Sequence, residues 1–213
     1  MIAAHIHDAL AQVRELKIRV LNAQHFTGYS GRFRALGGIA ALLAPFAMST
    51  RWYPATDDAH VAGWGAVFLL AVLSNYSALL YWFLCHPESQ RDVRRLMPTL
   101  DAIPPLLVGG ILTGALLLNE QYDLLFGTWM CLYGVANLSA GKTLPKALWG
   151  LGSFYILCGT VCLLAIPVDV TNPWPMGMVF GIGEVTGGYI FHRNRVSHAA
   201  AGTFVDSQGQ GHE

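Results

Sequence analysis

Residues 175–191 read PMGMVFGIGEVTGGYIF, an apolar run with one carboxylate, Glu184, at its middle. No other long hydrophobic run of the chain carries a carboxylate so deep inside it. An apolar run of this length is typical of a helix that crosses a membrane. Two pairs of glycines in it are each spaced by four residues, which lets a neighbouring helix approach closely. These predicted helix-packing residues are Gly177, Gly181, Gly183 and Gly187.

Composition places the whole chain in the membrane class. Of its 213 residues 54% are hydrophobic and 12% are charged, and the mean hydropathy is +0.43. Soluble domains average about 25% charged residues. The net charge of zero excludes a basic face for nucleic acid. The lipid bilayer is therefore the expected partner.

Six apolar segments divide the chain, and they predict an all-α polytopic membrane protein whose six transmembrane helices form three helical hairpins. The segments cover residues 35–50, 61–85, 101–118, 124–140, 147–166 and 175–191. The first lies between Arg34 and Arg51, whose side chains we expect to reach the water on either side. The predicted domains are a cytoplasmic amphipathic helix and linker at 1–34, the six-helix bundle at 35–192 and a mobile cytoplasmic tail at 193–213.

Basic residues alternate strictly between the connections. Twelve of the thirteen lysines and arginines lie before the first segment, in the second-to-third and fourth-to-fifth loops, or after the last segment. The exception is Arg51. Since cytoplasmic loops are enriched in basic residues, the pattern predicts that both termini lie in the cytoplasm.

Residues 1–25 carry a heptad pattern of apolar residues over about three repeats. Its seam is Ile2, Ile6, Ala9, Val13, Leu16, Val20 and Ala23. One interpretation is an amphipathic helix that packs on the protein's own cytoplasmic face or lies in the lipid interface. The other is a short coiled coil that joins subunits of a homo-oligomer or of a larger membrane complex.

The even-numbered segments suggest a repeat with one polar residue at a comparable depth in each. The matching stretches end at Asn75, Asn137 and Glu184. A charge at the bilayer centre costs roughly 2.5 to 3.5 kcal/mol on insertion scales, so Glu184 is expected to face the bundle interior. Two interpretations stay open. Glu184 is either a neutral carboxyl that donates a hydrogen bond between helices, or a site for a proton, a cation or a small polar ligand, with Asn75 and Asn137 as neighbours.

The sequence contains no complete set of residues for a haem, metal or catalytic site. His86 and His192 lie near the cytoplasmic ends of two segments, but two histidines do not make a haem or metal site on their own. The cysteines include Cys158 and Cys162 on one helix face, which lack further metal ligands. No nucleotide-binding or hydrolase motif is present in the sequence. We therefore predict no catalytic residue, no metal and no cofactor.

The runs LDAIPPLLVGGILTGALLL, LFGTWMCLYG and PWPMGMVFGIGE resemble a family of small bacterial six-span proteins of uncharacterised activity. The resemblance covers residues 20–192 and implies a bacterial inner-membrane location, with no activity attached. The leading functional hypothesis is a non-enzymatic accessory, scaffold or sensor protein. The alternative is a permease or channel that uses Glu184, and a haem or quinone oxidoreductase ranks third.

Overall fold

The computed structural model describes residues 13, 31–85, 97–140, 147–166 and 168–209, with side chains up to Asn194 in the last helix. Every regular element in this part of the chain is a helix, as the sequence predicts. The elements are α2 (Gly31–Met48), α3 (Asp57–Cys85), α4 (Met97–Asp101), α5 (Ile103–Leu118), the 3-10 turn η3 (Tyr122–Leu124), α6 (Leu125–Ser139), α7 (Ala147–Leu164) and α8 (Trp174–Gly209).

Three of the described helices are long and apolar enough to cross a membrane: α3, the helical stretch Thr99–Leu118 that contains α5, and α7. The remaining long helices fall short in length or in apolarity. α6 has 15 residues, fewer than the roughly 17 that a span usually needs. α2 carries Arg32 and Arg34, and α8 interrupts its apolar run with Glu184 and several glycines.

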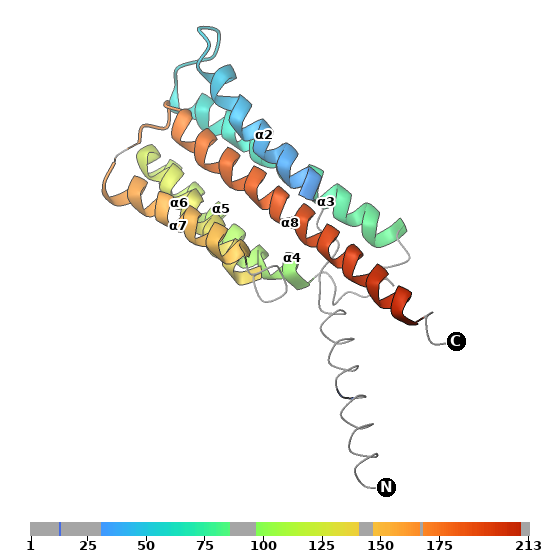
Figure 1. Cartoon of the computed structure of the whole chain (residues 1–213). Coiled ribbons are helices and arrows are strands. Elements are labelled where there is room, and N and C mark those ends of the chain that lie inside the picture. The colour runs from blue at the N-terminus through green and yellow to red at the C-terminus, as the bar shows by residue number, and fades with distance from the viewer. Residues whose placement is uncertain (1–12, 14–30, 86–96, 141–146, 167, 210–213) are drawn as a thin grey trace.

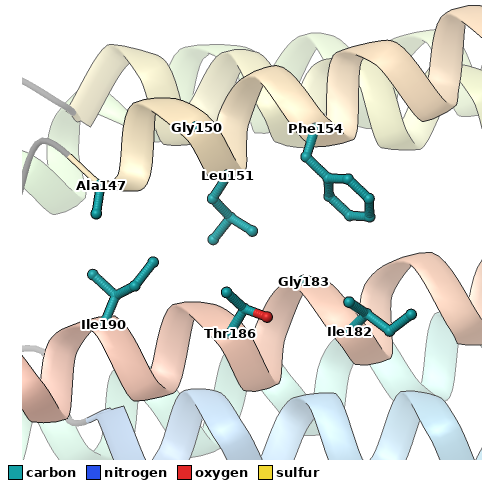
Figure 2. A pocket seen from close by; sticks show the side chains of 8 residues that line it. All are labelled: Ala147, Gly150, Leu151, Phe154, Ile182, Gly183, Thr186 and Ile190. Atoms are coloured by element: carbon teal, nitrogen blue, oxygen red, sulfur yellow. The ribbon is translucent and has the colours of Figure 1, made fainter.

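The long helices lie side by side in a bundle, and their packing is uneven (Figure 1). The two most extensive interfaces join α2 to α8 and α6 to α7. Contacts also join α2 to α3, α5 to α6 and α7 to α8, which are the partners in the three predicted hairpins. Since the largest interfaces lie elsewhere, the three-hairpin repeat stays a prediction. Between α7 and α8 a groove of about 290 Å³ remains (Figure 2).

Glycines spaced by seven residues bring α6 and α7 together. A Cβ atom at Gly127 would lie 2.9 Å from the carbonyl oxygen of Gly159, and one at Gly134 would lie 2.7 Å from that of Gly152. In the reverse direction, a Cβ at Gly159 would lie 2.7 Å from the carbonyl oxygen of Gly127, and one at Gly152 would lie 3.0 Å from that of Gly134. Real Cβ atoms do not approach a backbone oxygen so closely, so these positions require glycine. A seven-residue spacing on both helices keeps the seam facing the partner along an antiparallel pair.

The α2–α8 interface uses the same spacing. Along α2, the residues that face α8 are Gly31, Gly38 and Pro45. Gly31 meets the backbone of Gly188, Gly38 lies against Glu184, and Pro45 fills the space beside Gly177. The seam therefore runs from one end of α2 to the other, with Glu184 opposite its middle.

Two apolar clusters lie along the bundle. The larger includes Met48, Trp64, Phe126 and Val170, from the end where α2, α5 and α7 terminate and α3, α6 and α8 begin. The smaller consists of Leu148, Leu151, Tyr155 and Phe191, contributed by α7 and α8. The smaller cluster forms one wall of the candidate site.

The two ends of the chain are described only in part. The heptad stretch 1–25 lies outside the described residues except for Val13, which is exposed. The helical backbone of α8 continues to Gly209, within the segment 193–213 that composition predicts as a mobile tail. Its side chains from residue 195 onward are not described.

Candidate functional site

Arg34 lies in the second turn of α2, and its side chain points into the bundle. The sequence analysis assigned Arg34 to the membrane boundary and expected it to reach water. Instead only 6% of its side chain is exposed, because Glu184 on α8 lies opposite and offers a carboxylate. Gly187 leaves the space that the guanidinium occupies, since a Cβ at that position would lie 2.5 Å from Arg34 Nε.

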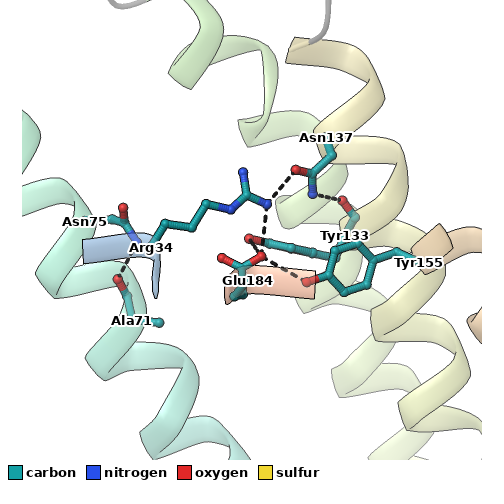
Figure 3. Close-up of polar contacts among 7 residues, drawn as sticks. All are labelled: Arg34, Ala71, Asn75, Tyr133, Asn137, Tyr155 and Glu184. Atoms are coloured by element: carbon teal, nitrogen blue, oxygen red, sulfur yellow. Dashed lines mark hydrogen bonds and ion pairs between the residues drawn. The ribbon is translucent and has the colours of Figure 1, made fainter. Parts of the chain in front are cut away.

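One oxygen of Glu184 accepts three hydrogen bonds (Figure 3). Arg34 Nη2 donates to Glu184 Oε1 at 2.9 Å, and the two groups form an ion pair. The hydroxyl of Tyr133 donates to the same oxygen at 2.9 Å, and that of Tyr155 donates at 3.0 Å. A cation and two hydroxyl donors converge on one oxygen, so Glu184 is the acceptor that links α8 to α2, α6 and α7.

Asn137 completes the site from α6. Its side-chain oxygen accepts a hydrogen bond from Arg34 Nη2 at 2.8 Å, and its amide nitrogen donates to the carbonyl oxygen of Tyr133 at 2.8 Å. Both ends of the amide are therefore used. We call Arg34, Tyr133, Asn137, Tyr155 and Glu184 the polar cluster.

Asn75, the third polar residue of the predicted repeat, does not join the polar cluster. Its amide nitrogen donates to the carbonyl oxygen of Ala71, one turn earlier on α3, at 3.2 Å. Figure 3 shows it on a helix that lies apart from Glu184. The structure therefore brings together two of the three residues that the sequence singled out, Asn137 and Glu184.

The four glycines singled out on α8 serve different neighbours. Gly183 lies against the hydroxyl of Tyr155, and Gly187 lies against Arg34, so both border the polar cluster. Gly181 lies against Leu42, and Gly177 lies against Pro45, both on α2. Each of the four would place a Cβ in conflict with its neighbour.

Some hydrogen-bonding capacity in the polar cluster is unused. Arg34 Nε is buried and has no hydrogen-bond partner among the described residues. All of the hydrogen bonds to Glu184 described above go to Oε1. On the other side, the guanidinium lies 5.6 Å from the ring centroid of Phe191. A cation that is paired, hydrogen-bonded and set against an aromatic ring is compensated in several ways for its loss of hydration.

Sequence reasoning missed Arg34, Tyr133 and Tyr155. One signal was present for Tyr133, which precedes Asn137 by four residues and so lies on the same helix face. For Arg34 the signal was physical, because a buried carboxylate requires a compensating charge. The boundary placed at residue 35, four residues after α2 begins, assigned that charge to the water.

No cluster of three or more histidine, cysteine or acidic residues that would hold a metal ion occurs in the part of the chain that the structure describes. His86 lies outside the described residues, so its pairing with His192 is not addressed. The polar cluster contains no cysteine or histidine. Its chemistry is that of an ion pair and hydroxyl donors in a buried site.

Comparison of the chain with protein-family models, with curated proteins and with solved structures finds no match.

Proposed function

We propose that this chain is a non-enzymatic integral membrane protein that acts as an accessory, scaffold or sensor component through helix packing. The observation that carries the proposal is the position of the polar cluster. Arg34 and Glu184 come from α2 and α8, whereas Asn137, Tyr133 and Tyr155 come from α6 and α7. The polar cluster thus connects the two closely packed helix pairs of the bundle.

The energetics of a buried ion pair support this role. Such a pair contributes little net stability, because desolvation of both ions offsets their attraction, whereas loss of one partner is costly. In some proteins buried polar groups specify one packing arrangement among several. We propose that the polar cluster specifies how the α2–α8 pair sits against the α6–α7 pair.

The proposed layout has six spans with both termini in the cytoplasm of a bacterium. α2, α6 and the first half of α8 add three spans to the three helices that are apolar enough on their own. α2 and α8 supply Arg34 and Glu184, which lower the apolarity of these two helices, and the shorter helix α6 supplies Asn137. Intramembrane polar groups of this kind face the bundle interior and pair with one another.

A permease or channel for a proton, a cation or a small polar solute is the second candidate. The unpartnered Arg34 Nε favours it, because a solute would find a free donor there. Against it stands the low exposure of the pair, with 6% of the Arg34 side chain and 11% of the Glu184 side chain accessible. A transport path has to reach the coupling group, so this exposure favours the packing role.

Reconstituted liposomes separate the two candidates. Purified protein is incorporated into vesicles that contain a pH-sensitive dye, and proton flux is followed after an imposed pH gradient. Under the packing role, flux equals that of empty vesicles, and Glu184→Gln lowers the denaturant resistance of the protein in detergent. Proton flux in the unmodified protein that disappears in a fully folded Glu184→Gln variant would overturn the proposal and establish transport.

A further inference from the structure

The bundle contains two tightly packed helix pairs that meet across a looser seam. The most extensive interfaces join α2 to α8 and α6 to α7, and in both of them glycines bring the helix backbones close together. The α7–α8 interface between the two pairs is less extensive, and the groove of about 290 Å³ runs along it (Figure 2). Closely packed elements resist deformation, so each pair is expected to move as a unit and the seam to absorb the movement.

The two ends of the bundle differ in how firmly they are held. At one end the larger apolar cluster joins α2 and α3 to α6, and Trp64 of α3 meets Phe126 of α6 with ring centroids 6.1 Å apart. The groove lies nearer the other end, because its α7 lining extends from Ala147, where that helix begins, to Phe154. The end with the larger apolar cluster is therefore the pivot end, and the groove end has space for movement.

The polar cluster is divided unequally between the two helix pairs. Both members of the ion pair belong to one helix pair, because Arg34 is on α2 and Glu184 is on α8. The α6–α7 pair contributes only uncharged groups. The hydroxyls of Tyr133 and Tyr155 donate to Glu184 Oε1, and the amide of Asn137 accepts from Arg34 Nη2. Separation of the helix pairs would therefore break these three hydrogen bonds and leave the ion pair intact.

The ion pair has unused hydrogen-bonding atoms on both sides. Arg34 Nε is buried without a partner, and Glu184 Oε2 accepts no hydrogen bond within the described part of the chain. Arginine and a carboxylate form two parallel hydrogen bonds when each group uses two atoms. Here the contact uses one atom of each group, and Oε1 is shared among three donors. Figure 3 shows the carboxyl facing the guanidinium, so a carboxyl released by the tyrosines could turn Oε2 toward Nε.

We infer that the bundle has a second, less populated arrangement, in which the α2–α8 and α6–α7 pairs separate at the groove end. In that arrangement Arg34 and Glu184 form two parallel hydrogen bonds, through Nε and Oε2 as well as through Nη2 and Oε1. The added bond offsets part of what is lost with the tyrosines and Asn137. The polar cluster is then a conformational switch. This inference rests on the proposed packing role and adds that the polar cluster selects between two arrangements.

Distances between spin labels, measured by double electron–electron resonance on the full-length protein in liposomes, test this inference. The four native cysteines are first replaced. Leu36→Cys on α2 and Trp149→Cys on α7 then report the groove end, and Leu43→Cys and Leu157→Cys on the same two helices report the pivot end. All four side chains are more than half exposed, so the labels disturb little packing.

Replacement of Tyr133 and Tyr155 by phenylalanine removes the two hydroxyls that hold Glu184. This double variant should raise the population with the longer groove-end distance at least about tenfold, as expected for loss of hydrogen bonds to a charged group. The pivot-end distance should not change. Addition of Arg34→Lys should cancel the increase, because lysine keeps the charge but has no second nitrogen for the two-atom contact.

Three results would overturn the inference: an unchanged groove-end distance in the double variant, an equal change at both ends, or an increase that persists with Arg34→Lys. Circular dichroism and the pivot-end distance show whether each variant folds. If the double variant does not fold, Tyr133→Phe alone should give a smaller increase in the same direction. A single arrangement in every variant would leave the packing role standing, because that role is judged by proton flux and denaturant resistance.

Discussion

At the scale of single residues, Arg34 and Glu184 form a buried ion pair between α2 and α8. Each charge is buried, and each is tolerated because the other lies 2.9 Å away. Tyr133, Tyr155 and Asn137 occupy further hydrogen-bonding positions of the pair. Removal of one ion would leave the other without compensation, whereas removal of both would leave an apolar contact between α2 and α8.

A double-mutant cycle measures this dependence. Arg34→Leu and Glu184→Leu should each lower the free energy of unfolding by about 3 to 5 kcal/mol, and the double variant should lose less than the sum. The measurement is denaturant unfolding in detergent, followed by circular dichroism. Strictly additive losses would show that the two side chains do not depend on one another, contrary to the geometry.

A second prediction concerns Asp169, in the connection between α7 and α8. The backbone N–H of Thr171 donates to its carboxylate at 2.8 Å and the Thr171 hydroxyl does so at the same distance, and these bonds lower the pKa of Asp169. A lowered pKa in the folded protein stabilises the fold above the pKa of the unfolded carboxyl. That contribution is lost as the pH falls through the folded value.

Thr171→Val removes the hydroxyl donor and keeps the backbone donor. It should therefore raise the pKa of Asp169 part of the way toward its ordinary value. NMR titration of the side-chain carboxyl carbon measures the change, and Asp123, which has no comparable donor among the described contacts, serves as the reference carboxyl. An unchanged pKa of Asp169 would mean that the hydroxyl bond does not form.

At the scale of helices, substitution by alanine should have opposite effects at a glycine inside the α6–α7 seam and at one outside it. Gly159→Ala places a methyl group against the backbone of Gly127 and Cys131, so it should destabilise the bundle by about 1 to 3 kcal/mol through overpacking. Gly114→Ala on α5 meets no neighbour, so it should be neutral or stabilising by up to about 1 kcal/mol, because alanine is the better helix former. Thermal unfolding of the two variants in the same detergent compares them, and equal effects would contradict the seam.

The helices show which features a sequence encodes locally. The predicted segments 61–85, 101–118 and 147–166 correspond closely to α3, α5 and α7, because an unbroken apolar run needs no partner to be recognised. The boundary of α2 was missed because Arg34 reads as a flanking charge unless its partner on α8 is known. Residues 34 and 184 are 150 positions apart, and only tertiary packing brings them together.

The glycine spacing of seven residues was present in the sequence at Gly127, Gly134, Gly152 and Gly159. It could have predicted that α6 and α7 pair. The sequence analysis instead emphasised the glycines of α8, where the same property is shared among contacts to α2 and α7. Small residues indicate a close approach, but they do not identify the partner helix.

At the scale of the whole molecule, apolar surface is distributed as expected for a bundle that faces lipid. α5 has no buried residue, and Leu107, Ile111 and Leu118 on it are largely exposed. On α3, Leu70, Leu73 and Leu80 are also exposed. In water such a surface would be a strong aggregation hazard, whereas in a bilayer it requires no further partner. The polar cluster, in contrast, lies among α2, α6, α7 and α8, away from this surface.

The length of α8 gives the final prediction, which concerns orientation. Its 36 residues extend about 54 Å, well beyond a hydrocarbon layer of about 30 Å, so in the proposed six-span layout one end projects into water. The first turn of α8 and the connection before it lie at the same end of the bundle as the turn after α5, while α8 ends at the far side (Figure 1). Because the alternation of basic residues along the sequence predicts cytoplasmic termini, Gln121 should face outward and Gly209 should face the cytoplasm. In a variant with its four native cysteines replaced, a membrane-impermeant maleimide should label Gln121→Cys in intact cells. Gly209→Cys should be labelled only after permeabilisation. Labelling of both positions in intact cells would place the end of α8 outside and would contradict the six-span layout.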